Sequence, residues 1–159
     1  MIDPRSFRQM MGCFATGVAV VTARGSDGVG VGLTINSLTS VSLDPPLVLF
    51  CLDKKAQLYP TFKKAGFFAV NFLAEGQEAI SRHFADHHHN PKPKNLWDKP
   101  QEGCPILRQT LGWIACRKTA LYKGGDHDIF MGEVVRLHKR SGHRDPLVYF
   151  HGRYRQIKP

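Results

Sequence analysis

Two groups of polar residues flank a strongly apolar run and could together hold one ligand. They are Thr34, Asn36 and Ser37 before the run, and Asp53, Lys54 and Lys55 directly after it. Hydroxyl and amide groups suit the polar edge of a ring. Ammonium groups, together with the backbone N–H groups of a helix beginning near Lys55, would suit a phosphate. The pattern predicts a pocket for a ligand with a polar ring and an anionic tail.

The first group also has an ordinary explanation. Thr34 and Asn36 alternate with Ile35, so the two polar side chains project to one face of a strand and the apolar one to the other. A solvated strand face gives the same alternation. These residues alone therefore leave both a pocket wall and a plain surface open.

A histidine in a predicted turn is a further candidate. His127 stands in Gly124-Gly-Asp-His-Asp128, between two predicted strands. A hairpin connection in which Asp126 and Asp128 bond to nearby backbone explains the turn without any ligand. A histidine at a strand entrance can also hydrogen-bond a carboxamide or supply a proton near neutral pH.

Two other patterns suggest common cofactor sites but lack the context that these sites need. Gly28, Gly30 and Gly32 form G-x-G-x-G, yet β-type residues continue where a Rossmann turn would open a helix. His83 and the histidines at 87–89 include an i,i+4 pair, but no acidic or cysteine partner has metal-site spacing. We expect neither a Rossmann fold nor a metal site.

Composition narrows the class of protein. The 159 residues suffice for one compact domain spanning 1–159. The net charge of +9 favours anionic ligands. Basic and aromatic residues show no ordered nucleic-acid motif, and apolar runs fall well short of the roughly 18 residues of a membrane span. Four scattered cysteines without C-x-x-C are typical of reduced thiols. We expect a cytoplasmic protein that binds neither nucleic acid nor membrane.

The elements that must position these residues are mainly strands. A helix is predicted to begin at Asp3-Pro4, and short helices are predicted around 58–65 and 75–86. Strands are predicted at 17–23, 29–37, 47–52, 67–73, 112–122, 129–138 and 147–154. The unbroken apolar run at 47–52 is typical of a strand buried on both faces, and 87–105 reads as a long surface loop. Hairpin-like spacing favours a mainly β, antiparallel barrel of six or seven strands over a doubly wound α/β sheet.

Several segments, in order along nearly the whole chain, resemble the flavin reductase family. They include Gly32-Leu-Thr-Ile-Asn-Ser37, Phe68-Ala-Val-Asn-Phe-Leu73 and Gly125-Asp-His127, with further matches at 7–22, 40–48, 132–134 and 146–150. Members of this family are the small reductase components of two-component flavin-dependent monooxygenases and have an FMN-binding split-barrel fold. The chain departs from the family pattern mainly at 87–95, which puts substrate or partner specificity in doubt.

The resemblance implies an NAD(P)H:flavin oxidoreductase. It implies a homodimer with one FMN or FAD per subunit near the interface, NADH or NADPH over the exposed flavin face, and hydride transfer from nicotinamide C4 to flavin N5. Reduced flavin would then pass to a partner monooxygenase.

The resemblance also assigns roles to residues by position. The isoalloxazine and ribityl region would be lined by Thr34, Ile35, Asn36 and Ser37. The ribityl and phosphate end would meet Asp53, Lys54, Lys55 and Arg82. The nicotinamide would border His127, with Tyr154 walling the same pocket.

Two other classes remain open at this point. One is a split-barrel protein that holds flavin tightly as a sensor, store or electron-transfer module, without fast NAD(P)H turnover. The other is a basic nucleic-acid-binding β-barrel, for which charge alone would give weak, salt-dependent binding.

Overall fold

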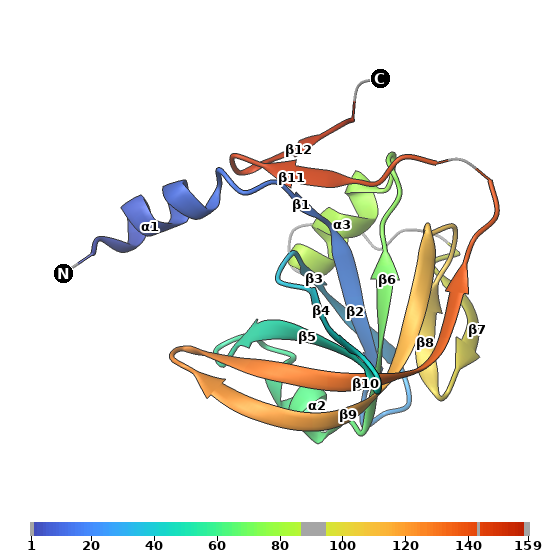
Figure 1. Cartoon of the computed structure of the whole chain (residues 1–159). Helices are drawn as coiled ribbons and strands as arrows, with labels where there is room; N and C mark the ends of the chain where they lie inside the picture. The colour runs from blue at the N-terminus through green and yellow to red at the C-terminus, as the bar shows by residue number, and fades with distance from the viewer. Residues whose placement is uncertain (1, 87–94, 143, 158–159) are drawn as a thin grey trace.

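The computed structural model describes residues 2–86, 95–142 and 144–157 (Figure 1). The helices are α1 (Pro4–Met11), α2 (Tyr59–Lys64) and α3 (Glu78–Ala85). The strands are β1 (Thr16–Gly17), β2 (Ala19–Arg24), β3 (Gly30–Ile35), β4 (Thr39–Leu43), β5 (Pro46–Asp53), β6 (Phe67–Phe72), β7 (Trp97–Gln101), β8 (Cys104–Leu107), β9 (Gly112–Gly124), β10 (His127–Lys139), β11 (Val148–Phe150) and β12 (Arg153–Arg155). No helix in these ranges is both long and apolar enough to cross a membrane.

Seven strands form the main sheet, in the order β3-β2-β6-β9-β10-β5-β4, and every neighbouring pair is antiparallel. β3 and β4 follow one another in the chain but lie at opposite ends of this order. The short connection between them therefore brings the two edges of the sheet together. Ser37 Oγ donates to the carbonyl of Cys51 on β5 (3.1 Å) and accepts from its N–H (3.0 Å), which fastens the closure. The predicted antiparallel barrel is confirmed.

Aromatic rings fill the barrel. Phe50 of β5 stacks on Phe130 of β10 with ring centroids 5.1 Å apart, and Phe68 of β6 meets Phe50 edge-on at 5.2 Å. Phe62 from α2 also packs edge-on against Phe50, so this short helix adds its ring to the same core. Ring pairs of this geometry stabilise a core beyond the area that they bury.

A second buried layer lies between β2, β3 and α3. A Cβ placed on Gly32 would lie 3.0 Å from the ring of Phe84, so a side chain here would push α3 slightly away from β3. Val18 and Val20 join Phe84 in this layer, whereas Ala19 and Val21 face the barrel core. β2 is therefore buried on both faces.

The sequence predicted that the strand at 47–52 would be buried on both faces, and this prediction was wrong. Along β5, the buried Val48, Phe50 and Leu52 alternate with partly exposed residues. Both faces of this strand carry apolar side chains, so its hydrophobicity alone could not show which face was covered.

The predicted surface loop at 87–105 was wrong in its second half. Residues 97–107 form the hairpin β7–β8, and Cys104, Ile106 and Leu107 are buried. The polar Asn71 of β6 holds this hairpin: its Oδ1 accepts from the Leu107 N–H (2.9 Å) and its Nδ2 donates to the Val20 carbonyl (3.1 Å). The predicted strand at 147–154 is likewise a hairpin, β11–β12, and β4 was not predicted at all.

The N-terminal helix forms where the sequence predicted it, with Asp3 accepting from the Ser6 N–H (2.9 Å) as its N-cap. It projects from the barrel, and none of its residues is buried (Figure 1). Met10 of α1 is 72% exposed, and Phe14, which follows the helix, is 71% exposed. Its apolar face is therefore left uncovered by the described chain.

Candidate functional site

The predicted site residues fall into two groups joined by a bridge. The first group surrounds α3. Thr34 Oγ1 donates to the carbonyl of Ser81 (2.7 Å), and the Ser81 hydroxyl hydrogen-bonds the hydroxyl of Tyr154 (2.8 Å). The guanidinium of Arg82 lies 5.0 Å from the centre of the Tyr154 ring and is ion-paired with Glu78 at 2.6 Å. Ser81, which the sequence did not single out, connects these residues.

Asn36 differs from its neighbours on the same segment. The hydroxyls of Thr34 and Ser37 already have backbone partners. Asn36 is exposed, and its amide forms no hydrogen bond with the described residues. An amide that can both donate and accept fits the pyrimidine edge of an isoalloxazine, where N–H and C=O groups alternate. This open amide is the feature of the segment that suits a bound flavin.

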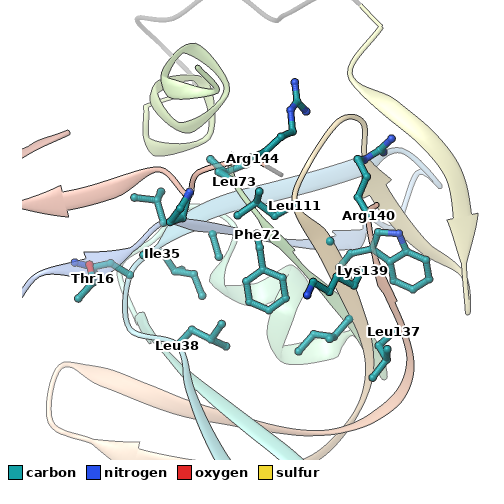
Figure 2. A pocket seen from close by; sticks show the side chains of 18 of the residues that line it. Thr16, Ile35, Leu38, Phe72, Leu73, Leu111, Leu137, Lys139, Arg140 and Arg144 are labelled. Atoms are coloured by element: carbon teal, nitrogen blue, oxygen red, sulfur yellow. The ribbon is translucent and has the colours of Figure 1, made fainter. Parts of the chain in front are cut away.

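A cavity of about 710 Å³ opens beside Asn36, where β6 ends and β9 begins. Figure 2 shows Ile35 and Leu38 on one side of it and Leu137 and Lys139 on the other, with Phe72 between them. Arg140 and Arg144 stand at its rim, each donating to a backbone carbonyl. Ile35 and Asn36 are the predicted site residues that line it, and the Ile35 side chain is largely buried in the barrel core.

Ser37 is the bridge to the second group. Its paired hydrogen bonds to Cys51 place the polar end of β3 beside β5, two residues before Asp53. Asp53 in turn pairs with His127 across β5 and β10. A continuous line of residues thus runs from Thr34 through Cys51 to His127, although these positions are far apart in sequence.

The second group lies where β5 ends beside the β9–β10 turn. His127 Nδ1 is 2.8 Å from Asp126 Oδ1, and this contact holds the pKa of the Asp126 carboxyl below its usual value. Lys54 donates through its backbone N–H to the Asp126 carbonyl (3.1 Å) and through Nζ to the Gly125 carbonyl (2.5 Å). The turn that precedes His127 is therefore fastened to β5 through Lys54.

A buried carboxylate that the sequence assigned only to turn geometry lies at the centre of this group. Asp128 is 5% exposed and accepts from the Tyr59 hydroxyl at 2.5 Å. Lys54 Nζ lies 3.2 Å from Asp128 Oδ1, an ion pair in which Oδ1 receives no aligned hydrogen bond from the described residues. The Tyr59 hydrogen bond is the main cause that lowers the pKa of Asp128; burial opposes it, and Lys54 acts in the same direction.

The structure bears on two expectations about this region. The helix expected near Lys55 begins only at Tyr59, so its N–H groups do not converge with the lysines. Tyr154 lines a separate pocket of about 530 Å³ with Arg82 and Tyr149, and His127 is not among the described residues of that pocket. A nicotinamide pocket shared by His127 and Tyr154 stays a prediction.

The histidine pattern divides between described and undescribed parts of the chain. His83 is buried on α3, with its ring 4.9 Å from that of Phe84. The histidines at 87–89 lie outside the described residues, as does most of the atypical 87–95 segment. Within the described ranges, no three His, Cys, Asp or Glu side chains gather as a metal site would require.

The chain matches known proteins over most of its length. It is 41% identical over 152 residues to the FMN reductase (NADH) SmoA of Agrobacterium fabrum, covering 96% of this chain and 85% of that protein. It is 37% identical to the flavin-dependent monooxygenase reductase subunit HsaB of Rhodococcus jostii, over 99% of this chain and 80% of that protein. A longer Rhizobium meliloti relative is 42% identical, and the chain spans only 49% of it.

Solved structures agree with the fold. The Streptomyces globisporus NADH:FAD oxidoreductase SgcE6, solved in complex with NAD and FAD fragments, superposes with a TM-score of 0.87. The two proteins are 38% identical, over 100% of this chain and 97% of that one. The family model described as a flavin reductase like domain matches residues 11–158. With the barrel and the order of its segments, this match shows that the chain belongs to the flavin reductase family.

Proposed function

We propose that this protein is an NADH-dependent flavin reductase that supplies reduced flavin to a partner monooxygenase. The relatives named as NADH-dependent FMN and FAD reductases, and as monooxygenase reductase subunits, support this activity. The observation that carries it in this chain is the open amide of Asn36 within the line of residues from Thr34 to His127.

Bound flavin and nicotinamide supply the redox chemistry, a hydride passing from nicotinamide C4 to flavin N5. The task of the protein is to hold the two rings in contact geometry. Asn36 would bond the pyrimidine edge of the flavin, with Thr34 and Ser37 fixing the backbone on either side of it. His127 would orient the nicotinamide carboxamide, while Arg82 and Tyr154 offer a cation and an aromatic face beside α3.

An absorbance and turnover experiment tests this function. Purified protein is mixed with FMN or FAD, the spectrum is recorded, and NADH or NADPH oxidation is followed with excess free flavin. We expect steady NADH oxidation over many equivalents of flavin. Reduction that stops after one equivalent of bound flavin would instead identify a tight flavin-binding protein, such as a sensor or electron-transfer module.

The homodimer is also a proposal, supported by the uncovered apolar face of α1. Phe7, Met10, Met11 and Phe14 each expose more than half of their surface, and the cavity beside Asn36 has an apolar floor. A stable interface buries about 1,600 Å² in total, and exposed side chains of this size on two copies would supply a substantial share.

Sedimentation velocity tests the dimer. We expect the wild type to sediment as a dimer and the double variant Phe7→Ser, Met10→Ser to dissociate at least tenfold more readily. Arg8→Ser, on the same helix, serves as the matched control and should remain dimeric. A monomeric wild type at micromolar concentration would refute the proposal.

We further propose that the protein works in the cytoplasm. Its four cysteines, Cys13, Cys51, Cys104 and Cys116, are all free thiols, as a reducing compartment favours. Burial raises the pKa of both Cys104 and Cys116 to about 12, which makes these two unreactive.

A further inference from the structure

Two adjacent lysines follow β5, and the structure gives their ammonium groups different surroundings. Lys54 Nζ reaches the Gly125 carbonyl (2.5 Å) and Asp128 Oδ1 (3.2 Å), with 36% of its side chain exposed. Lys55 is exposed, and its ammonium has no hydrogen-bond or ion-pair partner among the described residues. The Lys54 ammonium is thus occupied by two partners of the protein, whereas the Lys55 ammonium has only a longer-range attraction to the Asp126 carboxylate and can form a charge-assisted hydrogen bond with a further anion.

The partner of Lys54 is itself fixed from a third element. The Tyr59 hydroxyl, at the start of α2, donates to Asp128 Oδ2. A buried carboxylate is stable only when it is paired and hydrogen-bonded, so Asp128 requires both Tyr59 and Lys54. The triad joins α2, the end of β5 and the start of β10.

This triad lies beside the β9–β10 turn, whose residues Gly125 and Asp126 directly precede His127 at the start of β10. Lys54 holds two consecutive carbonyls of that turn, those of Gly125 and Asp126, and Asp128 follows His127 in the chain. Gly125 has a φ of 72°, the left-handed conformation that glycine adopts without strain in a tight turn. The position of the His127 ring is therefore tied to the Tyr59–Asp128–Lys54 contacts.

On the basis of the proposed function, we infer that Tyr59, Asp128 and Lys54 form a triad that positions His127. Of the two lysines, only Lys55 attracts the flavin phosphate. Lys54 thus acts through the turn and contacts no flavin. The two lysines, equivalent in the sequence, have separate roles.

Flavin binding separates the lysines without requiring turnover. Quenching of flavin fluorescence is titrated with FMN and with riboflavin, which lacks the phosphate, for Lys54→Met, Lys55→Met and the surface control Lys64→Met. We expect Lys55→Met to weaken FMN about tenfold or more, the scale of one charge-assisted hydrogen bond, with riboflavin unchanged. The ratio of FMN affinity to riboflavin affinity should be the same in Lys54→Met as in Lys64→Met. An equal FMN-specific loss in Lys54→Met and Lys55→Met would overturn the assignment.

Steady-state kinetics test the positioning triad. In Tyr59→Phe and Asp128→Asn, we expect KM for NADH to rise several-fold at a temperature where circular dichroism shows the fold intact, with kcat less affected and the FMN-to-riboflavin ratio unchanged. Lys54→Arg, which keeps the positive charge, should raise KM for NADH less than Lys54→Met does. A lowered melting temperature with unaltered KM for NADH would reduce the triad to a purely structural role.

These outcomes are distinguishable from failure of the proposed function. If wild-type protein binds flavin but shows no NADH turnover, the reductase proposal and the triad's role toward His127 both fail, while the lysine assignment is still decided by the flavin titrations. If the wild type turns over NADH but all three lysine variants bind FMN alike, only the role of Lys55 is refuted.

Discussion

At the residue scale, hydrogen bonds to distant elements change the roles that the sequence suggested for individual polar residues. Thr34, Asn36 and Ser37 were selected together because they are polar and close in sequence. In the fold, the hydroxyls of Thr34 and Ser37 bond backbone groups of α3 and β5. Of the three, only Asn36 has a side chain without a hydrogen bond to the described residues. Alternation predicts which face a side chain occupies, but it cannot predict which partner from a distant element that face will meet.

Ser37 should matter for stability more than for ligand contact. Ser37→Ala removes both bonds to Cys51 and leaves a partly buried backbone N–H and carbonyl of β5 unpaired. We expect a loss of about 1–3 kcal/mol in the free energy of unfolding, measured by urea denaturation. Ser37→Thr retains the hydroxyl and serves as the control. A loss as large in Ser37→Thr as in Ser37→Ala would mean that the hydroxyl is not the cause.

Asp128 should make stability depend on acid. Its folded-state pKa is lowered, first by the Tyr59 hydrogen bond, so its stabilising contribution is complete above the unfolded value of about 3.9. The contribution is lost as the pH falls through the lower folded pKa. We expect Asp128→Asn to be less stable than the wild type at pH 6 and the difference to shrink below pH 4, in urea denaturation at a series of pH values. A difference that stays constant with pH would contradict this.

At the element scale, the sequence predicted most strands because their apolar and β-branched runs are local signals. It failed where pairing depends on distant residues. The hairpin β7–β8 contains Pro100 and Pro105 and charged residues that read as loop, yet Asn71 and Thr22 anchor its second strand: Thr22 Oγ1 donates to the Pro105 carbonyl at 2.6 Å. The line from Ser37 to His127 was hidden for the same reason, because it depends on barrel closure.

Asn71 provides the test at this scale. Asn71→Leu, similar in size, leaves the buried Leu107 N–H without its acceptor and removes the bonds to Val20 and Thr22. We expect a loss of about 2–4 kcal/mol in the free energy of unfolding. Thr22→Val, which disturbs the Pro105 contact but not the Leu107 N–H, should cost less. Equal losses would show that the Asn71 contact to β8 is not the dominant one.

At the scale of the whole molecule, the net charge of +9 adds a long-range attraction to the local contacts of the site. Salt screens such attraction over about 10 Å at 0.1 M ionic strength. We expect KM for FMN to rise as salt is raised from 20 to about 300 mM, with KM for riboflavin nearly constant. A parallel rise for both flavins would indicate a salt effect on the protein and not on the phosphate.

The small sheet that joins the two ends of the chain has a consequence for synthesis. β1 pairs Thr16 with Tyr149, and the Gly12 carbonyl accepts from the His151 N–H (2.9 Å), so β1 has no strand partner until residues 148–151 exist. Pairings this distant along the chain form late, and on a ribosome β1 must wait until β11 and β12 have been synthesised. The contact of Tyr154 with Ser81 and Arg82 belongs to the same late step. A nascent chain can therefore build most of its barrel before residues 148–155 exist, yet it completes the α3 side of the proposed site only once these residues have folded back onto β1 and α3.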